Sequence, residues 1–258
     1  MTTAEPSLDW DADKAPPQNL VDRLRPEIRA GGYARDDGTI HFFTRVNALL
    51  EPQMTVVDLG AGRGRDFQRD PDAYMQRLAK LQGKVARVIG IDVDDAILGH
   101  PFLDERHVVA PTAAWPLADG SVDMVVANWV LEHLRDPEFF AAELHRVLKP
   151  GGWLCAHTVN RWGYVGIGAR AVPNSLHARF LKGLWPGRND IDVFSVQYKL
   201  NSLSDLRRRF PVDAWDNCSY RASFVPKYTA ESPLLFHLFA AWQRIGTSSD
   251  LLVFIRKK

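Results

Sequence analysis

The sequence VVDLGAGRG, residues 56–64, is a short apolar run that ends in an acid and continues into three alternating glycines. A compact β-branched run bounded by glycine is typical of a buried strand in a parallel sheet. Glycine permits positive φ and lets the backbone come close to a ligand, so the strand can turn sharply into a helix whose first amides point at a bound group. The stretch therefore predicts a strand followed by a nucleotide-type cradle.

The spacing of these glycines narrows the kind of ligand. Gly60, Gly62 and Gly64 read G-x-G-x-G after Asp58, whereas a dinucleotide-binding turn reads G-x-G-x-x-G. The stretch resembles motif I of the class I S-adenosylmethionine-dependent methyltransferases. That resemblance implies that Asp58 helps to hold the methionine end of the cofactor. It also implies that the backbone of Gly60, Ala61, Gly62 and Gly64 passes beneath the cofactor. A tight strand–helix turn without a ligand is the alternative, which the rest of the chain must test.

Composition limits the setting in which the protein works. The 258 residues carry 32 basic and 31 acidic side chains, so no overall field draws the chain to nucleic acid or to membranes. The two cysteines, Cys155 and Cys218, are too few for a disulfide framework and favour a reducing, cytoplasmic setting. Residues 1–17 are polar and proline-rich, which predicts a flexible arm and neither a signal peptide nor an anchor. We expect residues 18–258 to form a single domain, with no nucleic-acid partner and no transmembrane segment.

Two helices are expected before the first strand. Apolar residues at helical spacing predict a helix over residues 20–28 that stops at Gly31 and Gly32. A second helix follows up to Leu50, with Thr39 as its cap. In the methyltransferases that the chain resembles, this region often folds over the cofactor. Tyr33, in the loop between the helices, is therefore a lid candidate, and an ordinary surface tyrosine is the alternative.

The second and third strands supply the rest of the expected cofactor site. Residues 86–91 read as a strand that ends at Asp92, whose carboxylate can accept two hydrogen bonds from a ribose diol. The resemblance implies that Val93 presses against the adenine. A polar loop over residues 65–71 and a helix over residues 73–81 are inserted between the glycines and this strand. Residues 107–110 read as the third strand; where many relatives place an aspartate for the adenine, this chain has Pro111. Adenine recognition is then left to backbone groups of Thr112 and Ala113 and to apolar packing that includes Trp115.

The family resemblance is strongest from residue 122 to residue 152. A strand over residues 122–127 is closed by Asn128, a further cofactor-binding candidate, and the phrase Leu131-Glu132-His133 leads into a helix over residues 137–148 and then into Lys149-Pro150-Gly151-Gly152. This arrangement resembles the type 11 group of small-molecule methyltransferases. Asn128 is followed by Trp129-Val130 and not by the Pro-Pro-aromatic loop of amino-methylating DNA enzymes. Neither cysteine suits a cytosine C5 enzyme, so methylation of DNA bases is not expected.

Two inserts are expected on the acceptor side, over residues 160–200 and 223–249. Between the two inserts we expect a helix capped by Ser202 or Ser204 and a sixth strand over residues 212–220. A seventh strand over residues 251–255 follows the second insert. In class I methyltransferases the insert after the fifth strand (residues 152–158) commonly covers the acceptor. Basic residues far outnumber acidic ones between residues 160 and 210, which suits a carboxylated or phosphorylated acceptor; an ordinary solvated face is equally consistent.

Two histidines are the candidate catalytic residues. An alcohol acceptor must lose its proton, and a histidine can accept it. His133 follows the fourth strand and His157 lies at the end of the fifth, so both lie beside the expected position of the methyl group. His133 has a structural alternative, which is packing against the helix that follows. Glu132 and His133 could also help to bind a divalent metal, as the ubiquinone-biosynthesis O-methyltransferases that share the phrase suggest, but one such pair is an incomplete ligand set. We therefore assign no metal.

The segment from Ser232 to Ile245 predicts a helix that is apolar nearly all round, with Ser232 as N-cap and Pro233 at its first position. Such a helix must be covered, and it is too short to span a bilayer. Packing against a helix over residues 176–184 is the favoured arrangement, so we expect a monomer. Dimerisation through residues 232–245 ranks second, and contact with a membrane that carries a lipid-linked acceptor ranks third.

Together these features predict a class I methyltransferase fold, which is a seven-stranded, mostly parallel sheet with helices on both faces, a reversed final hairpin and a helical insert after the fifth strand. The function expected from the resemblance is methyl transfer from S-adenosylmethionine, at oxygen, to a small-molecule or glycan-type acceptor. A cofactor-binding regulatory or scaffold protein without catalysis is the alternative. An NAD-dependent oxidoreductase is disfavoured by the glycine spacing.

Overall fold

The computed structural model describes residues 19–64, 74–171, 195–226 and 228–258. Its strands are β1 (Thr55–Leu59), β2 (Arg87–Asp92), β3 (Glu105–Val108), β4 (Val122–Asn128), β5 (Leu148–Val159), β6 (Trp215–Asn217), β7 (Tyr220–Ala222) and β8 (Asp250–Lys257). Its helices, among which η marks a 3-10 turn, are α1 (Leu20–Leu24), η2 (Pro26–Arg29), α2 (Gly38–Leu49), α4 (Tyr74–Ala79), η3 (Asp95–Gly99), η4 (Leu131–His133), α5 (Pro137–Val147), α6 (Tyr164–Ala171), α8 (Leu203–Arg209) and α9 (Pro233–Ile245).

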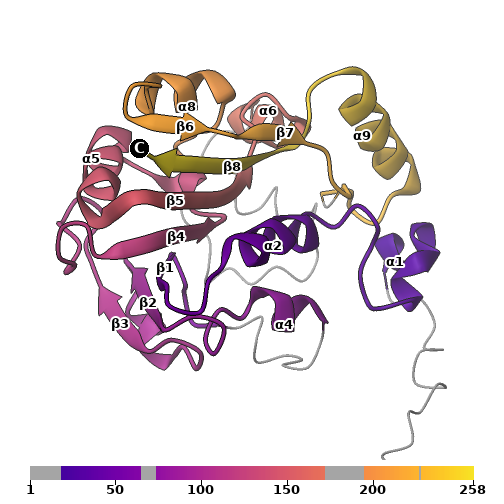
Figure 1. Cartoon of the computed structure of the whole chain (residues 1–258). Helices are drawn as coiled ribbons and strands as arrows, with labels where there is room; N and C mark the ends of the chain where they lie inside the picture. The colour runs from indigo at the N-terminus through magenta and orange to yellow at the C-terminus, as the bar shows by residue number, and fades with distance from the viewer. Residues whose placement is uncertain (1–18, 65–73, 172–194, 227) are drawn as a thin grey trace, which may run out of the picture.

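All of these strands join one mixed sheet in the order β3-β2-β1-β4-β5-β8-β6, with β7 also paired to β8 (Figure 1). The pairs from β3 to β5 are parallel, whereas β8 runs antiparallel to β5, β6 and β7. The predicted parallel sheet with a reversed end is confirmed. Because β1 and β4 are neighbours while their connection crosses the sheet, the strand order reverses beside the glycine turn, which is where open α/β sheets bind ligands.

Alternation along β1 assigns its side chains to the two faces of the sheet. Val57 and Leu59 pack towards α5 and α8, together with apolar residues of β4, β5 and β8. Val56 packs on the opposite face, where Phe42, Phe43 and Val46 of α2 cover it. A strand that is buried on both faces reads as a continuous apolar run, which is why residues 55–59 could be recognised from the sequence.

The expected first helix is shorter than its apolar spacing suggested. Helix α1 ends at Leu24, and Pro26 begins the separate turn η2. Proline lacks the amide proton that would continue the helix and disfavours helical geometry in the residue before it, so Arg25 leaves the helix. The second helix is capped by Asp37, which accepts hydrogen bonds from the amides of Thr39 and Ile40. The assignment of that cap to Thr39 was wrong by two residues.

The predicted sixth strand is divided into two. Both β6 and β7 pair with β8, but residues 218 and 219 interrupt them. Asn217 accepts a hydrogen bond from the amide of Ser219, and the Ser219 hydroxyl accepts one from the amide of Phe254. These local bonds replace the regular ladder, so the described part of the sheet has eight strands and not seven.

Helix α9 begins where the sequence predicted, with the Ser232 hydroxyl accepting a hydrogen bond from the amide of Leu235. It lies beside α1 at the end of the molecule to which β4 points (Figure 1). Phe236 packs with Leu20 and Val225, and Phe239 stacks on Tyr164 of α6 at 4.4 Å between ring centroids. The partner predicted for α9, residues 176–184, lies outside the described residues, as do the predicted arm over residues 1–17 and the loop over residues 65–71. Among the helices described, none is both long and apolar enough to cross a bilayer.

Candidate functional site

The turn after β1 has the backbone that its glycines predicted. Gly60, Gly62 and Gly64 all adopt positive φ, at 70°, 57° and 64°. A Cβ atom on Gly60 would lie 2.4 Å from the Val130 side chain, which follows β4, while one on Gly62 would meet nothing within 4 Å. Gly60 is therefore required by a close approach as well as by its φ, and the space beside Gly62 is open to a ligand.

Two carboxylates flank this turn, as predicted. Asp58 lies near the end of β1, and Asp92 ends the neighbouring β2. Asp92 accepts hydrogen bonds from the amides of Gly62 and Asp94, at 2.8 and 2.9 Å. Burial and the neighbouring charge of Asp92 raise the pKa of Asp58 to about 7. A cationic group placed beside Asp58 would lower that pKa again, so this carboxylate is suited to a ligand with an ammonium group.

The other predicted cofactor residues line the same edge of the sheet. Val93 follows Asp92 directly and is 50% exposed. The amide of Val109, just after β3, donates a hydrogen bond to the carbonyl oxygen of Asp92 at 2.7 Å. This bond brings the exposed Thr112 and Ala113 to the adjacent edge of the sheet. Trp115 does not join them. It is buried against Phe140 of α5, and its amide donates to Glu143. The expectation that Trp115 packs on the adenine was wrong, because the chain turns into the core after residue 114.

These residues fit S-adenosylmethionine. The Oδ1 atom of Asn128, at the end of β4, is buried without a hydrogen-bond partner in the described chain, which is the state expected of an acceptor that awaits a ligand donor. Each carboxylate oxygen has two acceptor positions, so Asp92 keeps capacity for a ribose diol while it holds the glycine turn. The glycine turn, the two carboxylates and the Asn128 side chain all lie at the carboxyl ends of neighbouring parallel strands.

His157 occupies an aromatic enclosure at the end of β5. It pairs with Asn128 of β4 in the sheet register, and its side chain is 1% exposed. The imidazole lies 4.2 Å from the ring of Trp129 and 5.6 Å from that of Phe224, measured between centroids. Neither ring nitrogen has a hydrogen bond in the described residues, and Nε2 lies 3.9 Å from Oδ2 of Asp250. A buried histidine that has no hydrogen bond and lies near a carboxylate is a candidate general base.

The backbone around His157 is unusually constrained. Trp129 adopts φ 60°, a left-handed conformation that costs a residue with a bulky side chain about 1–2 kcal/mol. Gly38, at the start of α2, lies so close that a Cβ atom there would approach His157 to 2.9 Å and Phe224 to 2.7 Å. The start of α2 therefore closes the enclosure, and no local pattern in the sequence predicts this contact because it joins distant segments.

His133 and Glu132 serve a different part of the structure. Nδ1 of His133 lies 3.1 Å from the carbonyl oxygen of Ser195, and the buried Glu132 accepts a hydrogen bond from the Thr158 hydroxyl at 2.7 Å. Asn201 donates to the same hydroxyl and to the carbonyl of Val159. Since Thr158 and His157 are successive residues of a strand, they face opposite sides of the sheet. No contact in the described structure brings the two predicted histidines together.

A metal role for Glu132 and His133 would need further ligands. Within residues that the structure describes, no group of three or more His, Cys, Asp or Glu side chains is arranged to hold a metal ion. Glu132 is bound to Thr158, and its carbonyl oxygen accepts the amides of Gln197 and Tyr198. The Leu-Glu-His phrase thus fastens the segment at residues 195–201 to the sheet.

A basic depression of about 730 Å³ lies next to this segment, between the start of α5 and helix α8. The cationic residues that line it are Arg135, Arg161, Lys199, Arg208 and Arg209, against three acids. Asp205 pairs with Arg208 and Arg161, and Glu138 with Arg209. Arg135 has no ion pair among the described residues. The positive charge predicted from the sequence between residues 160 and 210 is therefore gathered, in part, around one depression.

The described chain adds three residues that sequence reasoning missed, namely Gly38, Trp129 and Asp250. Trp129 follows Asn128 directly, so an aromatic side chain at the end of a ligand-binding strand was the available signal. Asp250 begins β8, and only its pairing with Val159, the end of β5, brings it to His157. A separation of more than ninety residues in sequence leaves no pattern that could predict the contact.

Comparison with known proteins bears on the same region. Residues 57–156 match the family model described as a methyltransferase domain. A probable S-adenosylmethionine-dependent methyltransferase of Mycolicibacterium smegmatis is 46% identical over 108 residues, which is 40% of this chain and 38% of that protein. A malonyl-[acyl-carrier protein] O-methyltransferase of Coxiella burnetii is 34% identical over 117 residues, or 45% of this chain and 36% of that one. The chain therefore matches well under half the length of these curated relatives.

The fold extends beyond the matched sequence. A geranyl diphosphate C-methyltransferase of Streptomyces coelicolor, solved with Mg²⁺, geranyl-S-thiolodiphosphate and S-adenosyl-L-homocysteine, superposes with a TM-score of 0.53 over 99% of this chain and all of that one, at 16% sequence identity. At this identity the likeness concerns the fold alone.

Proposed function

We propose that this chain is a class I S-adenosylmethionine-dependent methyltransferase and that it transfers a methyl group to an oxygen atom of a small-molecule or glycan-type acceptor. When bound, the sulfonium cofactor supplies an activated methyl group for in-line displacement. On this proposal Asp58 binds the ammonium group, Asp92 the ribose diol, and Asn128 a polar group of the cofactor. Val93 supports the adenine, with backbone groups of residues 112 and 113 at its edge.

Transfer to oxygen is supported chiefly by the state of His157. An alcohol is a poor nucleophile until a base takes its proton, and His157 combines an unpaired imidazole with a carboxylate 3.9 Å away, at the acceptor end of β5. His157 would hold the acceptor's proton at one ring nitrogen, while Asp250 orients the imidazole and stabilises its charged form. Because the imidazole is 1% exposed, the acceptor can reach it only if part of the enclosure formed by Trp129, Phe224 and the start of α2 moves.

His133 is assigned a positioning role in this proposal. Its contact with the carbonyl oxygen of Ser195 and the neighbouring Glu132–Thr158 bond hold residues 195–201, which form one wall of the basic depression. An anionic acceptor, carrying a carboxylate or phosphate, would suit that wall and the unpaired Arg135. The anionic group and the reacting oxygen would then be recognised by different parts of the acceptor site.

The test is transfer of a labelled methyl group from S-adenosylmethionine to fractions of a metabolite extract, followed by mass spectrometry of the product. We expect an O-methylated product, loss of at least about a hundredfold in turnover for His157→Gln, and a smaller loss for Asp250→Asn. His133→Gln should chiefly raise KM. Equal losses of turnover in the two histidine variants would contradict these separate roles.

Two results would reject the proposal as a whole. Tighter binding of NAD than of S-adenosylhomocysteine in calorimetry would reject the cofactor. Tight binding of S-adenosylhomocysteine with no labelled product from any fraction would favour the regulatory or scaffold alternative, which shares the fold but needs no base.

A further inference from the structure

Helix α9 has one face that the described structure leaves exposed. Leu234, Leu238, Trp242 and Ile245 are 68%, 54%, 46% and 87% exposed. At 100° per residue these four side chains and Ala241 fall within an arc of about 100°. Phe236 points to the opposite side of the helix, where it packs with Leu20 and Val225. The helix is thus held in place by one face and presents a continuous apolar stripe on the other.

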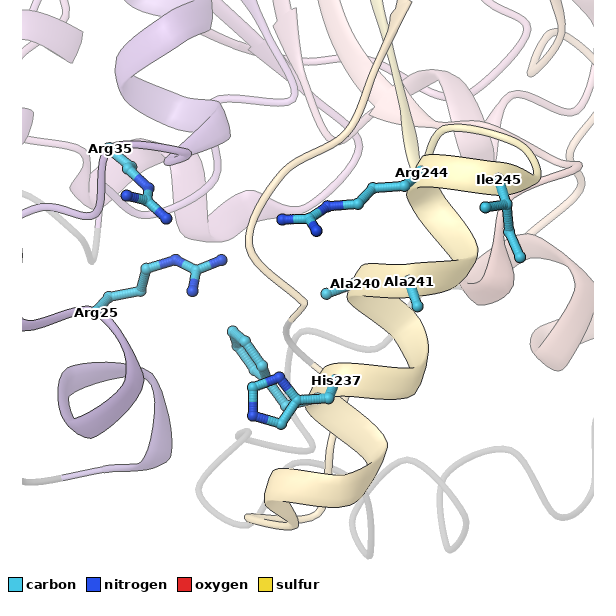
Figure 2. Close-up of a pocket in the computed structure, with 8 residues that line it drawn as sticks. Arg25, Arg35, His237, Ala240, Ala241, Arg244 and Ile245 are labelled. Atoms are coloured by element: carbon cyan, nitrogen blue, oxygen red, sulfur yellow. The ribbon is translucent and has the colours of Figure 1, made fainter.

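A basic pocket borders this stripe. The pocket has a volume of about 290 Å³ and lies between residues 25–35 and helix α9. Figure 2 shows the guanidinium groups of Arg25, Arg35 and Arg244 turned towards the same space. Among the described residues that line it, His237 adds a fourth nitrogenous side chain, and no carboxylate is present. On the helix, Arg244 and His237 fall on the flank next to Ala241, so the pocket and the stripe adjoin.

The three arginines differ in how far they are already neutralised. Arg25 is fixed by two hydrogen bonds to Asp36, at 2.8 and 3.0 Å, with its guanidinium 5.1 Å from the centre of the Phe236 ring. Arg35 lies 3.6 Å from Glu27 but remains largely exposed. Arg244 has neither a hydrogen bond nor an ion pair in the described part of the chain. The pocket therefore combines one rigid cation with two that can turn to an anion.

We propose that the α9 stripe and the Arg25–Arg35–Arg244 pocket form a docking surface for an anionic lipid bilayer. The stripe would lie in the plane of the interface with its apolar side chains among the acyl chains, Trp242 at the level of the headgroups, and a lipid phosphate in the arginine pocket. Helix α9, with 13 residues, would lie on the membrane and not cross it. This inference goes beyond the proposed methyl transfer and does not depend on it.

The arginine pocket is the reason to choose lipid over a second copy of the chain. A two-fold dimer brings the same surface of both subunits together. Pairing through α9 would therefore bring two copies of the unpaired Arg244 and the exposed Arg35 together, with no carboxylate among the residues that line the pocket, whereas anionic headgroups supply negative charge. Helix α6, which contacts α9 through the Tyr164–Phe239 stack, also exposes Ile167, and Trp162 just before it is exposed as well. Apolar exposure is thus concentrated at this end of the molecule.

The test is sedimentation of the full chain with vesicles of phosphatidylcholine alone or with phosphatidylglycerol added. We expect binding to the anionic vesicles that weakens with salt. Arg244→Gln should lower the partition coefficient about fivefold on anionic vesicles and leave the neutral ones unchanged. Leu238→Ser with Ile245→Ser should lower it at least about tenfold on both. These side chains are exposed, so thermal unfolding should match the wild type.

Matched controls are available on another part of the surface. Val212→Ser removes an apolar side chain that is 77% exposed, and Arg207→Gln removes an exposed cation of α8. Neither should change vesicle binding. Wild-type protein that ignores anionic vesicles would overturn the proposal, as would a dimer in sedimentation equilibrium that Leu238→Ser with Ile245→Ser dissolves. Inorganic phosphate that quenches Trp242 in a protein indifferent to vesicles would instead identify a site for free anions, and would also overturn it.

Discussion

At the scale of single residues, the role proposed for Asp58, near the end of β1, would link cofactor binding to pH. In the free protein, burial and Asp92 raise the pKa of Asp58 to about 7. A bound ammonium group requires the ionised carboxylate, so binding should release a proton below pH 7, and affinity should rise with pH. The ligand's own amino group stays largely charged up to about pH 7.5.

Calorimetry with S-adenosylhomocysteine should therefore show affinity increasing roughly eightfold between pH 6 and pH 7.5. Asp58→Asn should bind weakly with no such rise, because the titrating group is gone. Asp94→Asn, which changes the cap of η3 nearby, should keep the rise. A flat profile in the wild type would show that Asp58 does not hold the ammonium group.

A second residue-scale prediction separates backbone strain from close packing. Gly60 and Gly83 both have positive φ, at 70° and 85°, but only at Gly60 would a Cβ atom meet another side chain, Val130 at 2.4 Å. Gly83→Ala should cost about 1 kcal/mol of unfolding free energy through strain alone. Gly60→Ala should cost about 1–3 kcal/mol more through overpacking, measured by urea unfolding. Equal losses would mean that Val130 can move aside, and Val130→Ala should then change nothing in the Gly60→Ala background.

At the scale of elements, the network between η4 and β5 should fix the segment at residues 195–201. Thr158→Val keeps the shape of the side chain but removes the hydroxyl that bridges Glu132 and Asn201. Because buried polar groups then lose their partner, we expect a cost of about 1–3 kcal/mol in urea unfolding. Thr44→Val, on the exposed face of α2, should change stability by less than about 0.5 kcal/mol. Similar effects of the two changes would show that the network is not coupled to folding.

Elements with a local signal were predictable from the sequence. The β1 strand and its glycines are specified by burial on both faces and by positive φ, and Ser232 with Pro233 specifies the start of α9. The pattern predicts the wrong boundary where a local feature competes with it, as at Pro26, or where hydrogen bonds to the side chains of Asn217 and Ser219 interrupt a ladder. In the site, the acids and glycines follow from the chain itself. The enclosure of His157 by Gly38, Phe224 and Asp250 follows only from pairing of distant segments, which no pattern along the chain records.

At the scale of the whole molecule, helix α1 near the start of the chain packs against the last helix, α9. The amide of Leu20 donates to Glu231 at 2.7 Å, and Leu20, Val225 and Phe236 form a small core of their own. That core is separate from the two large clusters on the faces of the sheet. Helices α1 and α9 should therefore behave as one unit that can open without unfolding the sheet.

Hydrogen exchange can test this division. Phe236→Ala should cost about 3–5 kcal/mol within the small core, since its ring is fully buried. Exchange should then rise in both α1 and α9, although they are more than two hundred residues apart, while β1 and β4 keep their protection. Leu234→Ala, a truncation on the exposed face of the same helix, should leave both helices as protected as in the wild type. Uniform loss of protection throughout the sheet in Phe236→Ala would mean that the end of the molecule and its sheet unfold together, and that the proposed lipid-docking surface cannot move independently of the proposed methyl-transfer site.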